Sequence, residues 1–262
     1  MSENILEINN LSKYFGGLAA VSDCSLNVKK GTITGIIGPN GSGKTTLFNL
    51  IAGNLKSSSG EVLFNNEEIT DVPSYELFSK GLLRTFQIAH EFTNLSVLEN
   101  LMMVPGNQSG EKLMNTFLNP SLVAREEKEI KEKAEEVIEF LNLSHLSNEL
   151  AGNLSGGQKK LLELGRTMMV EAKLVLLDEV GAGVNRTLLK DLGTAIQKLN
   201  EEKGYTFCMI EHDMDFIGRL CNPVIVMAEG SVLFEGSVDE AKKDEKVIES
   251  YLGRGSKLKD KN

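Results

Sequence analysis

The residues that most constrain the fold form a glycine-rich loop of the pattern G-x-x-x-x-G-K-[ST], which runs from Gly38 to Thr45. An apolar run at 33–37 precedes the loop, and a helix-compatible run at 46–52 follows it. A loop between a buried strand and a helix N-terminus points several backbone N–H groups and the positive end of the helix dipole at one spot. The sequence therefore predicts an α/β fold with a site for nucleotide phosphates.

Each residue type in this loop has a chemical reason. Glycines at 38, 41 and 43 allow the backbone to approach the phosphates without a Cβ in the way. The Lys44 ammonium is expected near the β- and γ-phosphates of ATP or GTP, and the Thr45 hydroxyl is expected to ligate Mg²⁺. The predicted nucleotide-binding residues are Gly38, Pro39, Asn40, Gly41, Ser42, Gly43, Lys44, Thr45 and Thr46.

A second motif follows much later in the chain and consists of Leu154, Ser155, Gly156, Gly157 and Gln158. It stands before a stretch whose apolar residues recur at helical spacing. Serine is a favoured residue at the position before the first turn of a helix, where its hydroxyl accepts a backbone hydrogen bond. With the glycine pair beside it, this helix start is predicted to be a second place where an anion can bind.

Together the two motifs resemble the ATP-binding cassette (ABC) family, in which LSGGQ is the signature sequence, and the resemblance extends over nearly the whole chain. The stretch from Lys173 to Glu179, in which an apolar run at 174–177 ends in Asp178 and Glu179, resembles the family's Walker B strand. Such a run is typical of a parallel strand buried on both faces, and ligands gather at the carboxyl ends of these strands. The resemblance implies that Asp178 holds Mg²⁺ through water and that Glu179 polarises the attacking water as general base.

Three further residues take their expected roles from the same resemblance. Gln87 matches the glutamine of the Q-loop, which contacts Mg²⁺ and the attacking water. His212 follows a strand pattern at 205–211 and matches the switch histidine, which hydrogen-bonds the γ-phosphate. Phe15 matches the aromatic residue that stacks on adenine, and the adjacent Tyr14 is the alternative.

The chain departs from the family pattern after the expected catalytic glutamate. Members of this kind usually carry prolines where this sequence has Val180 and Arg186. The D-loop, which couples two nucleotide sites, corresponds to residues 182–185 and has Asn185 where many members have aspartate. Neither change removes a phosphate ligand, so the departures bear on the rigidity of this turn and on coupling between sites.

The resemblance also implies how the chain is organised. One ABC ATPase domain is expected over residues 1–253, with an antiparallel β subdomain near its start and a helical subdomain at about 88–155 inserted into the nucleotide-binding core. Residues 254–262 are expected to be a charged, disordered tail. Two such subunits, as a homodimer or a heterodimer, are expected to close head to tail so that Ser155 and its neighbours reach the ATP of the other subunit.

Composition sets the expected cellular context. The chain has 262 residues, of which 41% are hydrophobic, and this length suits one cassette rather than two. The formal net charge of −9 argues against a nucleic-acid partner, since surfaces that bind phosphate backbones are usually basic. Three widely spaced cysteines predict packed, reduced thiols. No run approaches the roughly 18 consecutive apolar residues of a membrane helix, so we expect a chain that does not span the membrane. The family resemblance then implies a cytoplasmic protein bound peripherally to the inner face of the plasma membrane.

Within the family, the sequence is most similar to the ATPase subunits of branched-chain amino acid importers. The residues that carry this similarity are Arg84 to Gln87, Asn94 to Asn100, Ile210 to Met214 and the closing Tyr-Leu-Gly. Urea or amide importers and lipopolysaccharide-export ATPases share several of these features and remain alternatives. The implied partners are membrane permease subunits and, indirectly, a solute-binding protein. The alternative from another class is a soluble ABC ATPase that acts as a mechanical switch in DNA repair or translation, although such proteins usually contain a long coiled-coil insertion or two cassettes.

Overall fold

The computed structural model describes residues 3–85, 91–106, 108–111 and 118–256, which form two compact units. The first unit comprises Met1–Arg84, Lys173–Gly181 and Gln197–Asn262, and the second comprises Thr85–Ala172 and Ala182–Ile196. This division differs from the expected helical subdomain at about 88–155. The helix after the signature motif packs with the other helices of the second unit, because its glycine face allows them to approach closely.

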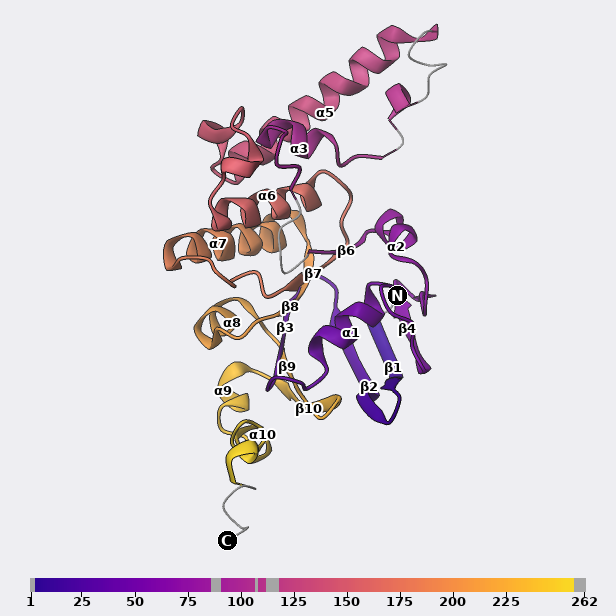
Figure 1. Cartoon of the computed structure of the whole chain (residues 1–262), viewed down its shortest axis with the longest axis vertical. Helices are drawn as coiled ribbons and strands as arrows, with labels where there is room; N and C mark the ends of the chain where they lie inside the picture. Colours follow the sequence, from indigo (N-terminus) through magenta and orange to yellow (C-terminus); the bar gives the residue numbers. More distant parts are fainter. Residues whose placement is uncertain (1–2, 86–90, 107, 112–117, 257–262) are drawn as a thin grey trace. The chain divides into compact units, whose positions relative to one another are not determined.

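A six-stranded sheet forms the centre of the first unit, with the strand order β10-β9-β3-β8-β7-β6 (Figure 1). Its strands are β3 (Ile33–Ile37), β6 (Leu82–Arg84), β7 (Leu174–Asp178), β8 (Thr206–Ile210), β9 (Val224–Ala228) and β10 (Ser231–Gly236). All neighbours pair in parallel except β9 and β10, which pair antiparallel. Every residue of β3, β7 and β8 is buried, which explains why these strands consist mainly of apolar residues.

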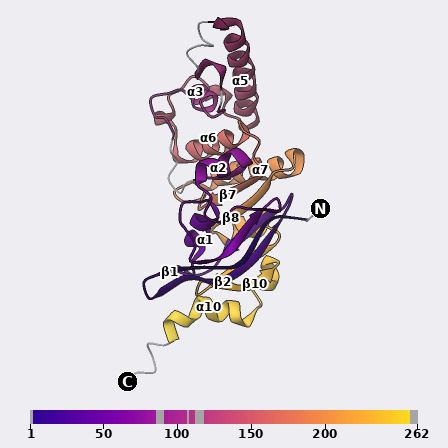
Figure 2. The same ribbon diagram turned by 90° about the vertical axis from the view of Figure 1, so that its right-hand side faces the viewer.

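A four-stranded antiparallel sheet, in the order β2-β1-β4-β5, forms the rest of the β-structure in this unit. Its strands are β1 (Asn4–Phe15), β2 (Leu18–Lys29), β4 (Ser59–Phe64) and β5 (Glu67–Glu68). Buried and exposed residues alternate along the second half of β2, as expected for a sheet with one covered face. The long β1–β2 hairpin lies beside β10 (Figure 2).

The helices of the first unit include α1 (Lys44–Ile51), α2 (Ser74–Lys80), α8 (Met214–Leu220), α9 (Val238–Ala241) and α10 (Glu245–Ser256). Helix α1 contributes Leu47 and Phe48 to one hydrophobic core that also contains residues from both sheets. Helix α10 continues to Ser256 and so extends past residue 254, where the tail was expected to begin. Glycine lowers helix stability by about 1 kcal/mol relative to alanine but, unlike proline, keeps its backbone N–H, so the two glycines near the end of α10 do not by themselves end the helix.

The second unit is built from helices α3 (Val97–Met102), α5 (Pro120–Phe140) and α6 (Gly156–Met168) and from the first part of α7 (Arg186–Lys203). Short 3₁₀ turns lie at Ser109–Glu111, Ser144–Leu146 and Ala151–Asn153. Helix α5 buries Ala134, Val137 and Ile138 and carries exposed Lys–Glu pairs at i,i+4 spacing elsewhere on its surface. A Cβ on Gly165 of α6 would lie 2.7 Å from a Leu141 methyl group, so glycine at this position allows the helices to approach without displacing that side chain.

Two further expectations from the sequence concern the cysteines and helices that could span a membrane. Cys24, Cys208 and Cys221 are free and buried, as predicted. Burial raises the pKa of Cys24 to about 11 and that of Cys221 to about 12, so these thiols remain protonated at neutral pH. None of the helices in the described part of the chain is long and apolar enough to cross a membrane.

Candidate functional site

The glycine-rich loop lies between β3 and α1, in the position that the sequence predicts. Gly38, Gly41 and Gly43 all have positive φ angles, of 148°, 79° and 100°. A Cβ on Gly38 would lie 2.1 Å from the carbonyl oxygen of Met227, and a Cβ on Gly43 would lie 2.4 Å from that of Ala20. The loop therefore requires glycine at both positions for conformational and steric reasons.

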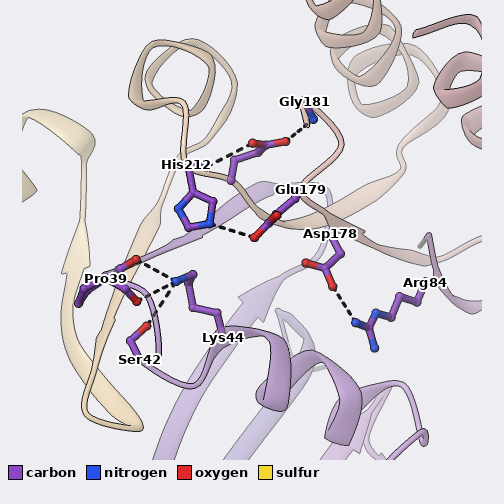
Figure 3. A network of polar contacts seen from close by, with 10 residues as sticks. Pro39, Ser42, Lys44, Arg84, Asp178, Glu179, Gly181 and His212 are labelled. Carbon is purple, nitrogen blue, oxygen red and sulfur yellow. Dashed lines mark hydrogen bonds and ion pairs between the residues drawn. The ribbon is translucent and has the colours of Figure 1, made fainter. Parts of the chain in front are cut away.

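Lys44 begins α1 and turns its ammonium group back over the loop (Figure 3). Its Nζ donates to the carbonyl oxygens of Gly38 and Pro39 at 2.8 and 3.1 Å, and its side chain is almost fully buried. Burial lowers the pKa of Lys44, while the negative charges of Glu179 and Asp178 act in the opposite direction. The ammonium is thus a positive charge held between the loop and two carboxylates, which is an arrangement suited to a polyanionic ligand.

Asp178, the last residue of β7, forms a buried ion pair with Arg84 at the end of β6. The Arg84 Nη2 donates to Asp178 Oδ2 at 2.7 Å (Figure 3). The Arg84 Nη1 donates to Asn49 Oδ1 of α1 at 2.7 Å. The guanidinium also lies 5.9 Å from the centre of the Phe48 ring. Arg84 therefore joins the strand that ends in Asp178 to the helix that follows the glycine-rich loop.

Glu179 follows β7 in a left-handed backbone conformation with φ of 48°. This conformation is uncommon for residues other than glycine and is often found at functional sites. The Glu179 N–H donates to the Ile210 carbonyl oxygen at 2.9 Å, which fixes the turn to the end of β8. The Glu179 carboxylate is 2.9 Å from Nε2 of His212 (Figure 3). The parallel pairing of β7 and β8 thus places an acid and an imidazole side by side at the sheet edge.

Glu211 lies between β8 and His212, and its carboxylate is buried with two backbone donors. One carboxylate oxygen accepts from the Gly181 N–H at 2.6 Å, and the other accepts from the His212 N–H at 3.2 Å. Burial raises the pKa of Glu211, and these two N–H groups partly offset that effect. Gly181 and His212 are both labelled in Figure 3, on the two turns that Glu211 joins.

The oxygen donors near the loop fit a magnesium ion. Thr45, an exposed residue in the first turn of α1, offers a hydroxyl, and Asp178 offers a carboxylate whose charge acts on neighbouring Lys44. Hard oxygen ligands suit Mg²⁺, which is commonly held by one or two protein groups together with substrate phosphates and water. The described residues contain no cluster of three or more His, Cys, Asp or Glu side chains that could hold a metal without such phosphates.

The signature motif lies in the second unit, at the start of α6. Ser155 caps this helix: its Oγ accepts from the Gln158 N–H, and the Gln158 side chain accepts from the Ser155 N–H. Ser155 and Gly156 are exposed, whereas a Cβ on Gly157 would lie 2.5 Å from a Leu188 methyl group. Leu154 is buried beneath the motif. The expected helix start is confirmed, with its first residues open to a ligand from outside the unit.

The remaining predicted residues are Phe15, its alternative Tyr14, and Gln87. Phe15 ends β1 and is 49% exposed, with the Lys13 ammonium 5.3 Å from the centre of its ring, and Tyr14 is 47% exposed. Exposure alone therefore does not separate the two candidates for stacking on adenine. Gln87 lies outside the described residues.

Sequence reasoning missed Arg84, Asn49 and Glu211 as parts of this network. Arg84 and Glu211 do carry a signal, because each is a charged residue directly attached to an apolar strand run. A charge at a strand end is usually solvated, so this signal alone does not reveal that both side chains are buried. Asn49 carries no such signal, since asparagine on a helix is ordinary.

The chain is similar to known proteins over most of its length. A family described as "ABC transporter" matches residues 21–182. The chain is 43% identical to the "Probable branched-chain amino acid transport ATP-binding protein LivG" of Archaeoglobus fulgidus, over 95% of each chain.

Two solved structures extend the likeness to three dimensions. An ATP-binding cassette of an ABC transporter, in its ADP conformation, superposes with a TM-score of 0.81 and 39% identity, covering 96% of this chain and 100% of the other. A dimeric ATP-binding cassette bound to ADP and phosphate in a post-hydrolysis state superposes with a TM-score of 0.71 and 25% identity, covering 89% and 98%.

Proposed function

Since this chain belongs to the ABC transporter family, as an ATP-binding and ATP-hydrolysing subunit, we propose that it drives the import of branched-chain amino acids through a separate membrane permease. The observation that carries the hydrolytic part of this proposal is the contact between Glu179 and His212, together with the electrostatic interaction of Glu179 with the Lys44 ammonium of α1. The transported solutes are inferred from the name of the relative described above.

The mechanism assigns binding and chemistry to different residues of the first unit. The backbone N–H groups of the loop from Gly38 to Thr46 and the Lys44 ammonium bind the phosphates of ATP. Thr45 and Asp178, with Gln87, would hold Mg²⁺, which supplies positive charge against the phosphate oxygens. Phe15 stacks on the adenine ring.

Proton transfer and sensing of the γ-phosphate belong to the acid and imidazole pair. Glu179 accepts a proton from the attacking water, which makes the water a better nucleophile. His212 hydrogen-bonds the γ-phosphate and, through its contact with Glu179, holds this carboxylate in place. Catalysis of phosphoryl transfer depends largely on such positioning and charge stabilisation.

Uptake by a reconstituted complex tests the proposed transport function. The chain would be used to capture its membrane partners from detergent-solubilised native membranes, and the complex would be placed in liposomes. We expect ATP-dependent uptake of leucine, isoleucine or valine when the matching solute-binding protein is present. ATP-dependent uptake of an unrelated solute alone would contradict the proposed substrate, and recovery of DNA-repair or translation factors instead of a permease would favour the soluble alternative.

We propose that the exposed start of α6 completes the ATP site of a second subunit, which is either a copy of this chain or a related one. Ser155 and Gly156 present a helix N-terminus to the outside of their unit, and helix N-termini favour phosphate. The dimeric cassette that resembles this chain is bound to ADP and phosphate. Each subunit would then supply one half of two shared sites.

Ser155→Arg is expected to abolish steady-state ATP hydrolysis while leaving ATP binding to the monomer within about twofold, because the bulky cation disrupts only the contribution to the partner. Mixing this variant with Glu179→Gln gives one intact shared site and should restore part of the activity. Ser147→Arg, an exchange at another serine of the same unit, is the control. Normal turnover of Ser155→Arg would contradict a role for the signature residues in hydrolysis.

We further propose that the permease docks near Phe92, which places the protein peripherally on the inner face of the plasma membrane. The Phe92 backbone is fixed by the buried Asn100 side chain, at 2.9 and 3.0 Å. Its ring remains 48% exposed, with the Arg166 guanidinium 5.6 Å from the ring centre. The neighbouring Glu91 forms an ion pair with Lys159 of α6 at 2.7 Å. An exposed aromatic ring on a fixed backbone is a typical anchor at protein interfaces.

Phe92→Ala is expected to weaken docking to the permease by about 1–3 kcal/mol, because the aromatic anchor that fills the permease surface is removed. The melting temperature and ATP affinity should stay close to those of the wild type, since the ring is not part of the core. Binding to the purified permease and thermal unfolding would be measured together. Tyr75→Ala removes another exposed aromatic ring and serves as control. A large fall in melting temperature with unchanged docking would assign Phe92 a structural role.

A further inference from the structure

We propose that Glu211 is a positioning residue that ties the chain after Glu179 to His212, so that the two turns respond to nucleotide together. This inference rests on the proposed function, in which Glu179 and His212 act on ATP. Glu211 itself touches no reacting group. Its role would be to transmit a change at His212 to Gly181, which directly precedes the expected D-loop at 182–185.

The geometry provides two parallel links between the turns. Glu211 accepts from the Gly181 N–H at 2.6 Å and from the His212 N–H at 3.2 Å. The adjacent His212 side chain contacts Glu179 at 2.9 Å. Glu211 and His212, which are adjacent on one turn, thus contact Gly181 and Glu179, which are two positions apart on the other turn. A displacement of either turn relative to the other must break or stretch one of these bonds.

The residue type is significant, because a carboxylate at this depth is costly unless it is well bonded. Glu211 is 5% exposed, and burial raises its pKa. A carboxylate accepts hydrogen bonds at both oxygens, whereas a glutamine offers one oxygen acceptor and one NH₂ donor. Because the Gly181 N–H meets one carboxylate oxygen and the His212 N–H meets the other, glutamine in this position would set its NH₂ group against one of the two donors. Aspartate would keep two acceptor oxygens but is shorter by one methylene group. A merely space-filling role would be served equally well by glutamine.

The residues after Glu179 indicate where a movement of the His212 turn would be transmitted. Val180 is buried at 3% exposure, so the turn is fixed in the core at this point. Gly181 is the next residue, and its N–H is bound by Glu211. Motion of the His212 turn on γ-phosphate contact would thus reach the main chain at Gly181 first, and from there the covalently attached residues 182–185.

Hydrogen–deuterium exchange tests this link without depending on hydrolysis. In the wild-type chain, we expect a non-hydrolysable ATP analogue to slow hydrogen–deuterium exchange in two sets of peptides, those that cover 180–185 and those that cover 211–214. In Glu211→Gln, the analogue should still protect 211–214, but protection of 180–185 should disappear. Equal protection of both segments in the variant would overturn the inference. Failure of the wild type to bind nucleotide would instead contradict the proposed function.

Kinetics provide a second readout that a structural role would not change. Glu211→Gln is expected to lower kcat by about tenfold to a hundredfold, since small misplacement of catalytic groups is expensive. The KM for ATP and the melting temperature should remain near the wild-type values, because the exchange is isosteric and removes a buried charge. A kcat within twofold of the wild type, or a lowered melting temperature with unchanged kcat, would overturn the inference.

The other end of the bond offers an independent variant if Glu211→Gln folds poorly. Gly181→Pro removes the N–H donor, whereas Gly181→Ala keeps it and is the matched control. We expect Gly181→Pro to lower kcat and uncouple the two segments in exchange, with Gly181→Ala much closer to the wild type. Combined with Glu211→Gln, the proline should lower kcat little further, because both changes break one bond. Fully additive effects on kcat would contradict a shared role.

Discussion

Lys44→Ala is expected to abolish measurable ATP binding at micromolar nucleotide and, with it, all hydrolysis. The Lys44 ammonium is almost fully buried at the loop and is the positive charge that lies between the glycine-rich loop and two carboxylates. A hydrogen bond that involves a charged group contributes about 1.5–3 kcal/mol, so removing each such bond to a phosphate lowers the affinity by roughly tenfold to a hundredfold. Equilibrium binding of a fluorescent ATP analogue measures this effect.

The control for this prediction is Lys30→Ala, which removes an exposed lysine of the same unit and should leave binding unchanged. Thermal unfolding without nucleotide separates a binding defect from a folding defect, because Lys44 also donates to the carbonyl oxygens of Gly38 and Pro39. ATP affinity within threefold of the wild type for Lys44→Ala would show that this loop is not the phosphate site.

Glu179→Gln is expected to bind ATP normally but to lower kcat by about 10²–10⁴, the range typical for removal of a general base. Glutamine has nearly the same shape and can keep a hydrogen bond to His212, yet it cannot take a proton from water at neutral pH. Because hydrolysis no longer releases the nucleotide, ATP should trap the chain as a dimer. Phosphate release and sedimentation of the variant with ATP would be measured.

The matched control is Glu229→Gln. Glu229 also has a left-handed backbone, with φ of 50°, and its side chain is exposed, so the exchange tests whether such a substitution disturbs the fold by itself. Turnover of this variant should equal that of the wild type. Normal turnover of Glu179→Gln would remove Glu179 from the role of base and assign that role to another group near His212.

The nucleotide loop and the strands around it could be predicted because their signals are local. The run at 33–37 is apolar apart from Thr34 and Gly35, and the structure shows a fully buried strand followed by three glycines at positive φ. The same reasoning applies to β7, whose apolar run ends in Asp178. These features depend on residues close in sequence, so motif and periodicity are sufficient to locate them.

The pairing of Arg84 with Asp178 could not be predicted, because it depends on the neighbour relation of β6 and β7. Nothing in either segment specifies that the two strands are adjacent. The burial of Glu211 could not be predicted for the same reason, because its two backbone donors, Gly181 and His212, lie on different turns. The 48% exposure of the Phe92 side chain also depends on how the helices of its unit pack, so the sequence alone could not predict it. The unit boundary near α6 differs from the expected one because tertiary packing, rather than the motif, determines it.

The nucleotide site described above should become active only when a second subunit supplies its signature residues. Steady-state phosphate release by the purified wild-type chain, measured over a wide range of protein concentrations at saturating ATP and Mg²⁺, tests this requirement. We predict that the rate rises more steeply than in proportion to concentration when the protein is dilute, because active dimers form by association of two subunits. A strictly proportional rate across the whole range, from a chain that sediments as a monomer with ATP, would contradict the shared site.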